Sequence, residues 1–258
     1  MAVRKRFGQH FLHDQQVIDR IVEFLDPQPG ERLVEIGPGR GALTVPVLQC
    51  AGQLQVIEVD RDLARAALKK FSRHGELVVH EGDALTVDFS QFGDDLRVFG
   101  NLPYNISTPL LFHLMKYSTH IQDMLFMLQR EVVERMTAEP GSKTYGRLTI
   151  MLAAVARVEA LFVVGREAFT PPPRVDSMMV RLIPHTTAPF MVPDPALFAE
   201  VVRVAFSHRR KTLRNALAGL ATIQDIENAG QDPSLRPENI DPAGFCAISA
   251  ILLKRRQA

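Results

Sequence analysis

The sequence has few of the features that mark disulfide-stapled or membrane-spanning proteins. Its two cysteines, Cys50 and Cys246, form neither a disulfide framework nor a CxxC pair, so we expect a reducing compartment, the cytoplasm. The most apolar stretch, 150–164, contains Arg157 and Glu159 and is too short to span a bilayer, so no membrane partner is expected. The composition is that of an ordinary globular protein, with 46% hydrophobic residues. A length of 258 residues fits one large domain and a small one.

Metal-ligating side chains are also sparse. The eight histidines are scattered. His10 and His13 could share a helix face, but no third ligand lies nearby, so we expect no metal.

The charges nearly cancel, with a formal net charge of +1, but they are unevenly distributed. The N-terminal basic run 4–6 is not followed by an apolar segment, so we expect no secretory signal. The range 201–224 has no carboxylate, yet it holds Arg203, Arg209, Arg210, Lys211 and Arg214. A solvated helix face would explain one such cluster. Together with the basic ends 4–6 and 254–256, however, this asymmetry favours a phosphate-rich partner.

Alternating strand and helix patterns predict an α/β domain with a parallel, doubly wound sheet. We expect strands at 32–36, 54–59, 77–80, 96–100 and 123–128, and helices at 17–25, 42–50, 62–71, 108–117 and from 131. A further strand is expected at 178–183, then a proline-rich linker, and only helices from 196. We therefore predict two domains, 1–187 and 188–258.

Polar or glycine residues follow four consecutive strands of this predicted sheet, where open α/β sheets bind their ligands. Gly37 and Gly39 follow the first strand and let the backbone approach a ligand closely. Glu58 ends the second, where a carboxylate can accept ribose hydroxyls, and Asp83 follows the third, placed for an adenine amine. The fourth strand leads to Asn101.

Asn101-Leu102-Pro103-Tyr104 is the most informative segment. It could be an ordinary strand-terminal turn, because Asn and Pro are common turn residues. It also suits alkylation of an exocyclic amine on a planar base. The Asn101 side-chain carbonyl and a backbone carbonyl of the turn can accept the two amine hydrogens, which exposes the nitrogen lone pair. Pro103 fixes the backbone direction, and Tyr104 offers a ring on which the base can stack.

A dinucleotide-dependent dehydrogenase is the main alternative from a different enzyme class. Gly37-x-Gly39-x-x-Ala42 and Glu58 fit the pattern of a nicotinamide cofactor site. However, the tetrad has no role in hydride transfer. Glu35 would also place negative charge beside the loop, which suits a cationic sulfonium better than a diphosphate. The residues therefore favour methyl transfer from S-adenosylmethionine.

Five motifs in this order resemble the bacterial small-subunit ribosomal RNA adenine dimethyltransferase family. They span 4–12, 34–39, 98–109, 169–177 and 209–215, and the resemblance runs from about residue 4 to about 253. It implies a Rossmann-like class I S-adenosylmethionine-dependent methyltransferase domain with a small C-terminal all-helical domain. It also implies dimethylation of two adjacent adenines in a hairpin loop near the 3′ end of the RNA. The partner would be the immature small subunit, bound by a monomer.

The resemblance also implies roles for individual residues. The donor would be bound by His10, Leu12, Gly37, Gly39, Glu58, Asp83, Ala84 and Asn101. The target base would be held and activated by Asn101, Leu102, Pro103, Tyr104 and Phe169. The RNA would be contacted by Arg4, Lys5, Arg6, Arg209, Arg210, Lys211 and Arg214.

Two of these residues have plainer explanations when taken alone. His10 lies in a segment that could simply cap a helix or fill the core, and asparagine is also common at its position in the family. Phe169 precedes three prolines and would ordinarily be a hydrophobic plug. Beside the tetrad, we interpret it as the second ring of a clamp opposite Tyr104 that holds a base removed from its stack.

Two alternative functions stay open from the sequence. The erythromycin-resistance methyltransferases act on large-subunit RNA with the same chemistry and a similar tetrad, although the Gly100-Asn-Leu-Pro form and the 209–215 motif favour the small-subunit enzyme. The protein could instead be a ribosome assembly factor whose methylation is incidental.

Overall fold

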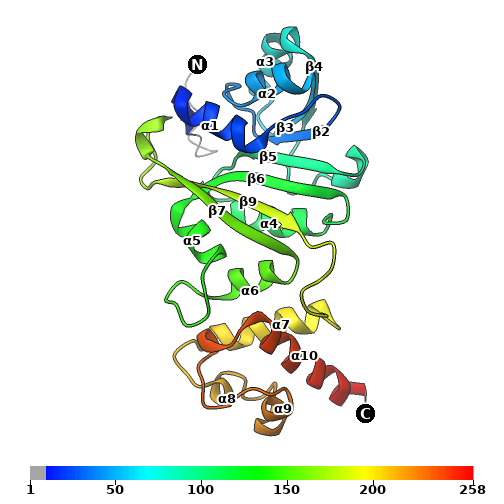
Figure 1. Cartoon of the computed structure of the whole chain (residues 1–258), viewed down its shortest axis with the longest axis vertical. Helices are drawn as coiled ribbons and strands as arrows, with labels where there is room; N and C mark the ends of the chain where they lie inside the picture. Colours follow the sequence, from blue (N-terminus) through cyan, green and yellow to red (C-terminus); the bar gives the residue numbers. More distant parts are fainter. Residues whose placement is uncertain (1–9, 258) are drawn as a thin grey trace. The chain divides into compact units, whose positions relative to one another are not determined.

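The computed structural model describes residues 10–257, which divide into two compact units (Figure 1). The first comprises the described residues up to Val133 together with Glu159–Pro184. The second comprises Glu134–Val158 and the described residues from His185 onward. One division thus lies close to the expected boundary at residue 187, but the second unit also takes in a segment from the middle of the chain. The proposed domains 1–187 and 188–258 stay a prediction.

A seven-stranded sheet has the order β4-β3-β2-β5-β6-β9-β7. Its strands are β2 (Arg32–Ile36), β3 (Gln53–Glu58), β4 (Glu76–Glu81), β5 (Leu96–Asn101), β6 (Ile121–Gln129), β7 (Ala156–Val164) and β9 (Ser177–Pro184). The five predicted strands up to β6 are parallel, as expected. The sheet as a whole is mixed, because β9 runs antiparallel to β6. Between β7 and β9 lie only the 3-10 turn Arg166–Ala168 and the short strand Phe169–Thr170. This connection is too short for the crossover that a parallel strand requires, so β9 cannot continue the parallel order.

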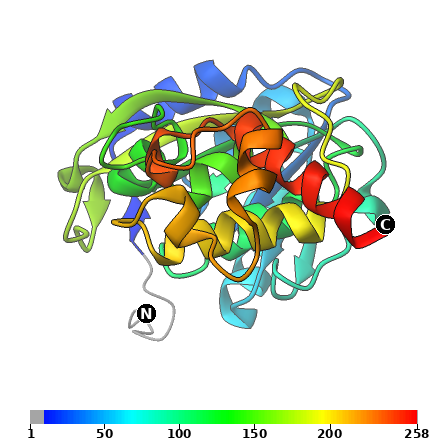
Figure 2. The same ribbon diagram turned by 90° about the horizontal axis from the view of Figure 1, so that it is seen from below.

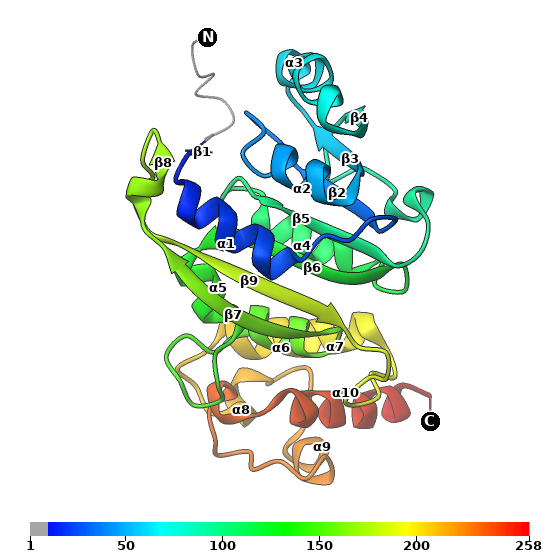
Figure 3. The same ribbon diagram turned by 45° about the horizontal axis from the view of Figure 1, so that its top comes forward.

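Helices cover both faces of the parallel strands. They are α1 (Gln15–Leu25), α2 (Thr44–Ala51), α3 (Arg61–Phe71), α4 (Ser107–Met115) and α5 (Arg130–Met136), with 3-10 turns at Ser72–His74, Phe89–Phe92 and Arg166–Ala168. Phe99 and Leu125 pack in one core cluster with Ile21 of α1 and Leu48 of α2. The next residue of β6, Phe126, is equally buried on the opposite face. Figure 3 shows α1 on one side of the sheet and α4 on the other. Burial on both faces explains the continuous apolar run 124–128 in β6.

The second unit is largely helical. It contains α6 (Arg147–Ala153), α7 (Pro195–Ser207), α8 (Leu213–Ala216), α9 (Ile223–Asn228), α10 (Pro242–Gln257) and a 3-10 turn at Pro237–Asn239. α7 and α10 pack together and bury Val201 and Phe245 completely (Figure 2). The helices expected after residue 196 are therefore confirmed, whereas α6 was not predicted. Of the helices in the described residues 10–257, none combines the length and apolar character needed to cross a membrane.

A small second sheet joins two segments far apart in the sequence. β1 (Phe11–Leu12) pairs antiparallel with β8 (Phe169–Thr170), so that Leu12 lies opposite Phe169. Figure 3 shows this pair beside the start of α1. Asp14 caps α1 by accepting the N–H groups of Gln16 and Val17. The pairing therefore fixes the chain immediately before its first helix.

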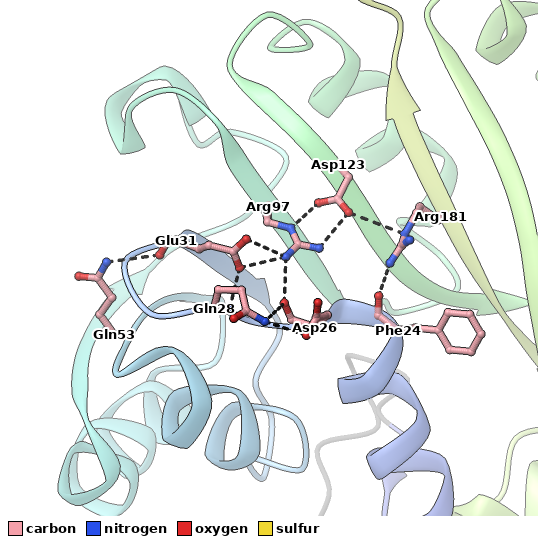
Figure 4. A network of polar contacts seen from close by, with 8 residues as sticks. All are labelled: Phe24, Asp26, Gln28, Glu31, Gln53, Arg97, Asp123 and Arg181. Carbon is pink, nitrogen blue, oxygen red and sulfur yellow. Dashed lines mark hydrogen bonds and ion pairs between the residues drawn. The ribbon is translucent and has the colours of Figure 1, made fainter.

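A buried ion network fastens the other end of α1 to the sheet (Figure 4). Arg97 of β5 donates two hydrogen bonds to Asp123 of β6, at 2.8 and 3.1 Å, and also binds Glu31 just before β2. It reaches the Asp26 carbonyl at 3.4 Å, while Arg181 of β9 donates to the Phe24 carbonyl at the end of α1. Burial would lower the pKa of Arg97, but Asp123 and Glu31 more than offset it, so the pKa is raised. The network ties together three strands and one helix.

We expect Asp123→Ala to destabilise the protein by about 3 to 5 kcal/mol, because it leaves a buried guanidinium partly unpaired. Urea unfolding measures the loss. Glu81→Ala is the matched control, because its partner Arg61 is 76% exposed in the side chain, and exposed pairs contribute less than about 1 kcal/mol. Equal losses in the two variants would show that the Arg97 network does not stabilise the fold.

Candidate functional site

A pocket of about 320 Å³ lies in the first unit, where β2, β3, β4 and β5 end. The chain leaves the neighbouring strands β2 and β5 toward opposite sides of the sheet, and ligands bind at such a switch point. The lining includes every predicted donor residue and the whole tetrad: His10, Leu12, Gly37, Gly39, Glu58, Asp83, Ala84, Asn101, Leu102, Pro103 and Tyr104. Residues from both sides of β2 thus meet in one cavity.

The glycine turn after β2 needs its glycines for backbone conformation. Gly37 and Gly39 have φ values of 71° and 53°, in the left-handed region that other residues avoid. Gly37 donates its N–H to the Ile57 carbonyl at 2.9 Å, which holds the turn against β3. The Phe11 ring lies on the turn, since a Cβ added at Gly39 would be 3.4 Å from it. β1 therefore covers the glycine turn directly.

Two carboxyl groups sit in the floor of the pocket. Glu58 is 3% exposed and accepts N–H groups of Asp60 at 2.9 Å and Gly39 at 3.4 Å. Burial raises its pKa, although these two N–H groups lower it. Glu35 is 2% exposed and accepts a 2.6 Å hydrogen bond from the Thr44 hydroxyl. Burial raises the pKa of Glu35 to about 8, against the effect of Thr44 and with a further rise from Glu58.

The interpretation of Glu35 as a fixed negative charge is therefore wrong. The sequence places the residue beside the loop, but only the structure shows that it is buried enough to keep its proton near neutral pH.

The Asn101 side chain has a defined orientation. Its Nδ2 donates to the His10 carbonyl at 3.0 Å. A backbone carbonyl only accepts, so the amide nitrogen must face His10 and the amide oxygen faces away. The preceding Gly100 lets β5 approach β2, because a Cβ there would lie 2.4 Å from the Ile36 carbonyl oxygen. The glycine before the tetrad is thus a steric requirement.

Tyr104 is held by partners from two other segments. Its hydroxyl bonds to the Ser177 hydroxyl at 2.7 Å, and Ser177, the first residue of β9, is completely buried. The His10 ring stacks on the Tyr104 ring at 5.9 Å and bonds through Nδ1 to the Pro171 carbonyl at 2.7 Å. Since that carbonyl accepts, Nδ1 carries the proton. Ser177 received no role from the sequence, although it closes the 169–177 motif.

The predicted clamp between Tyr104 and Phe169 is not formed in this structure. Phe169 is 2% exposed, packs in the hydrophobic core and is not part of the pocket lining. His10, not Phe169, faces Tyr104. The plainer explanation of Phe169 as a hydrophobic plug describes what is seen, and its part in stacking a base stays a prediction.

The predicted RNA-binding residues are only partly free. Arg4, Lys5 and Arg6 lie outside the described residues. Arg209 donates to Glu238 at 2.8 Å and to the carbonyls of Ser142 and Lys143 at 3.3 and 2.6 Å, so it holds a loop of its own unit. The remaining three are exposed: Arg210, Lys211 and Arg214.

The spacing of Arg209, Arg210, Lys211 and Arg214 in the sequence also predicts that several of them lie along one side of a single helix, and this prediction is wrong. α7 ends at Ser207, because His208 leaves the helical conformation, and a turn follows before α8. Thr212, with ψ 157°, is the N-cap residue before α8, in which Arg214 lies. Helical spacing in the sequence could not reveal this interruption, since it contains neither Gly nor Pro. As for metals, no group of three or more candidate ligands lies together within residues 10–257.

We expect Glu35→Gln to change how stability depends on pH. The folded protein keeps the Glu35 proton up to about pH 8, whereas the unfolded chain releases it near the ordinary pKa of 4.5. Stability conferred by the neutral carboxyl is therefore complete below pH 4.5 and is lost as the pH rises toward 8. The variant keeps the Thr44 acceptor and has no proton to lose, so its advantage should grow across this window to about 3 to 5 kcal/mol.

Urea unfolding at several pH values between 4.5 and 8.5 measures this difference. Glu23→Gln, on the exposed side of α1, controls for the removal of one surface carboxyl. An E35Q curve parallel to that of the wild type would show that Glu35 is charged in the folded protein.

The comparisons with known proteins agree with this geometry. The family model described as ribosomal RNA adenine dimethylase matches residues 1–251. The ribosomal RNA small subunit methyltransferase A of Pseudomonas putida is 53% identical over 99% of this chain and 97% of its own length. The protein of the same name from Pseudomonas aeruginosa is 53% identical over 95% and 93%.

Solved structures share the fold. A dimethyladenosine transferase from Plasmodium falciparum has a TM-score of 0.80 and 29% identity, covering 96% of this chain and 98% of its own. The 23S rRNA methyltransferase ErmE has a TM-score of 0.75 and 24% identity, covering 94% and 99%, and shows the fold alone. The fold is therefore that of a class I S-adenosylmethionine-dependent methyltransferase, and the chain belongs to the ribosomal RNA adenine dimethylase family.

Proposed function

We propose that the protein transfers methyl groups from S-adenosylmethionine to N6 of two adjacent adenosines in the 3′-terminal hairpin loop of small-subunit ribosomal RNA. The products are N6,N6-dimethyladenosines formed during ribosome biogenesis. The observation that carries the proposal is the orientation of the Asn101 amide, whose oxygen is directed away from His10 at the pocket. The small-subunit relatives at 53% identity support the choice of RNA.

The donor would lie along the ends of the strands. Glu58 of β3 accepts the ribose hydroxyls, and Asp83 and Ala84 after β4 contact the adenine. Gly37 and Gly39 let the backbone approach the donor closely, while His10 and Leu12 close the pocket from β1. The lining of one cavity by all of these residues supports this placement of the donor.

The target amine would be activated by two acceptors. Within the tetrad, the Pro103 and Tyr104 carbonyls already accept the Ile106 N–H and the Ser107 hydroxyl. The Leu102 carbonyl is left to accept one N6 hydrogen while the Asn101 oxygen accepts the other. The base would stack on Tyr104, whose ring His10 and Ser177 hold in place.

The reaction then needs little beyond positioning. The N6 lone pair attacks the methyl carbon, the carbon–sulfur bond breaks, and S-adenosylhomocysteine leaves with the electron pair on sulfur. The N-methylated amine is transiently positive and loses its proton to water. We assign no metal to this step, and we propose that the protein acts as a cytoplasmic monomer on the immature small subunit, without a membrane partner.

Mapping the modified nucleotides tests the function directly. Under-methylated small subunits, large subunits and protein-free RNA of both kinds are incubated with labelled S-adenosylmethionine. We expect label on two adjacent adenosines near the 3′ end of the small-subunit RNA. Label on large-subunit RNA instead would identify the erythromycin-resistance activity and refute the proposal.

Asn101→Ala should reduce kcat by more than tenfold, about 1.4 kcal/mol, and leave RNA affinity nearly unchanged. The amide stabilises the amine mainly in the transition state, so its loss affects turnover rather than binding. Single-turnover kinetics and a filter-binding assay measure the two quantities. Asn228→Ala, at the exposed end of α9, is the control. Retention of more than a tenth of the rate would exclude the proposed role, and unchanged subunit assembly in N101A would separate an assembly function from catalysis.

Arg210→Glu combined with Lys211→Glu should weaken RNA binding without changing donor affinity. Both side chains are exposed, whereas Arg209 is left intact because it holds its own loop. The slope of log affinity against log salt should fall by about 0.7 to 0.9 per lost phosphate contact. Lys69→Glu with Lys70→Glu, on exposed positions of α3, makes the same change in net charge. Equal slopes for the two double variants would mean that Arg210 and Lys211 contact no phosphate.

A further inference from the structure

An arginine at the pocket has no part in the function described so far. Arg40 follows Gly39 in the glycine turn and lines the pocket with an exposed side chain. Its guanidinium carbon lies 4.2 Å from the centre of the Phe11 ring. The same ring contacts the position of a Cβ on Gly39. A cation–π contact of this kind restricts the guanidinium to the face of the ring, beside the turn.

The charged groups of the pocket are mostly acidic. Burial favours the neutral form of Glu35, which leaves Glu58 and Asp83 as the other carboxyl groups, and Arg40 is the one permanent cation among the described residues that line the cavity. S-adenosylmethionine brings two positive centres, the sulfonium and the ammonium, and one carboxylate. The acidic groups suit the positive centres. The carboxylate would be repelled by them unless a cation lies nearby.

The order of the strands places the donor's amino-acid portion near this arginine. Across the sheet, the strands that end at the pocket have the order β4, β3, β2, β5. Asp83 follows β4 and Glu58 ends β3, so the adenosine occupies that side. The methyl group must reach the amine beside Asn101 at the end of β5. The amino-acid portion therefore lies by the glycine turn after β2, where Phe11 holds Arg40.

We propose that Arg40 binds the α-carboxylate of the methyl donor. The inference rests on the proposed function, since it requires S-adenosylmethionine in this pocket. A guanidinium has two parallel N–H groups that match a carboxylate, and the contact with Phe11 holds the group beside the glycine turn before the donor arrives. Arg40 thereby distinguishes intact donors from analogues that lack the carboxylate.

Calorimetry on the full chain tests this with two ligands, S-adenosylmethionine and its decarboxylated form, which differ only in the carboxylate. We expect Arg40→Gln to weaken S-adenosylmethionine by about tenfold and the decarboxylated form by less than twofold. Wild type should prefer the intact donor, and the variant should lose this preference. Arg20→Gln is the matched control, because Arg20 makes a similar contact, 3.9 Å from the Phe162 ring, and does not line the pocket.

The alternative outcomes are distinct. Equal weakening of both ligands would mean that Arg40 only supports the shape of the turn, and would overturn the inference. Unchanged donor affinity with a fall in RNA affinity would assign Arg40 to an RNA phosphate and overturn it as well. Failure of the wild type to bind either ligand would refute the proposed function itself. The two failures are distinguishable, because the inference about Arg40 is tested by the difference between variant and wild type.

Discussion

The hydrogen bond from the Asn101 amide to the His10 carbonyl determines how the rest of the site is built. It joins the end of β5 to the segment that enters β1, and it sets which amide atom faces the pocket. The His10 ring also stacks on Tyr104 and bonds to the Pro171 carbonyl, so one residue contacts three segments of the chain. The backbone of His10 contacts Asn101, whereas its ring contacts Tyr104 and Pro171. The orientation of Asn101 therefore depends on the position of the His10 backbone, and that of Tyr104 on the His10 ring.

In the first unit, contacts lie at both ends of the parallel strands. At the ends opposite the pocket, Arg97 joins β5, β6 and the loop before β2, while Arg181 reaches the end of α1. At the pocket end, β1 and β8 pair. α1 has 11 residues and spans about 16 Å between these two anchors. The ion network therefore lies at one end of α1, and the β1–β8 pair lies just before the other end.

Much of the fold was predictable, because β2, β5 and β6 have apolar residues that are buried on both faces and because α1 and α3 each have a periodic apolar side. The direction of β9 was not, since an apolar run such as 177–184 has the same pattern whichever way it points. α6 was missed for a similar reason: it lies in an apolar stretch that continues directly into β7. The local sequence of a strand does not determine which strand it pairs with or in which direction.

The pocket lining was predictable to a greater extent than the surroundings of individual residues. Motifs located Glu35, Phe169 and Arg209. Burial favours the neutral form of Glu35, Phe169 packs in the core outside the pocket, and Arg209 of the second unit pairs with Glu238. Each outcome depends on neighbours distant in the chain. Ser177 shows the converse case, since its bond to Tyr104 appears only when β9 is placed beside β6.

The pairing of β1 with β8 has a consequence for the synthesis of the protein. Phe11 and Leu12 emerge early, but their partners Thr170 and Phe169 follow after more than half of the chain. The glycine turn, Glu58 and the tetrad are all translated before β8, the strand that pairs with β1. A nascent chain stopped before β8 would thus contain every residue of the pocket lining, but β1 would lack its partner strand. The pocket should accordingly become complete only after residue 170 has been translated, when β1 can pair.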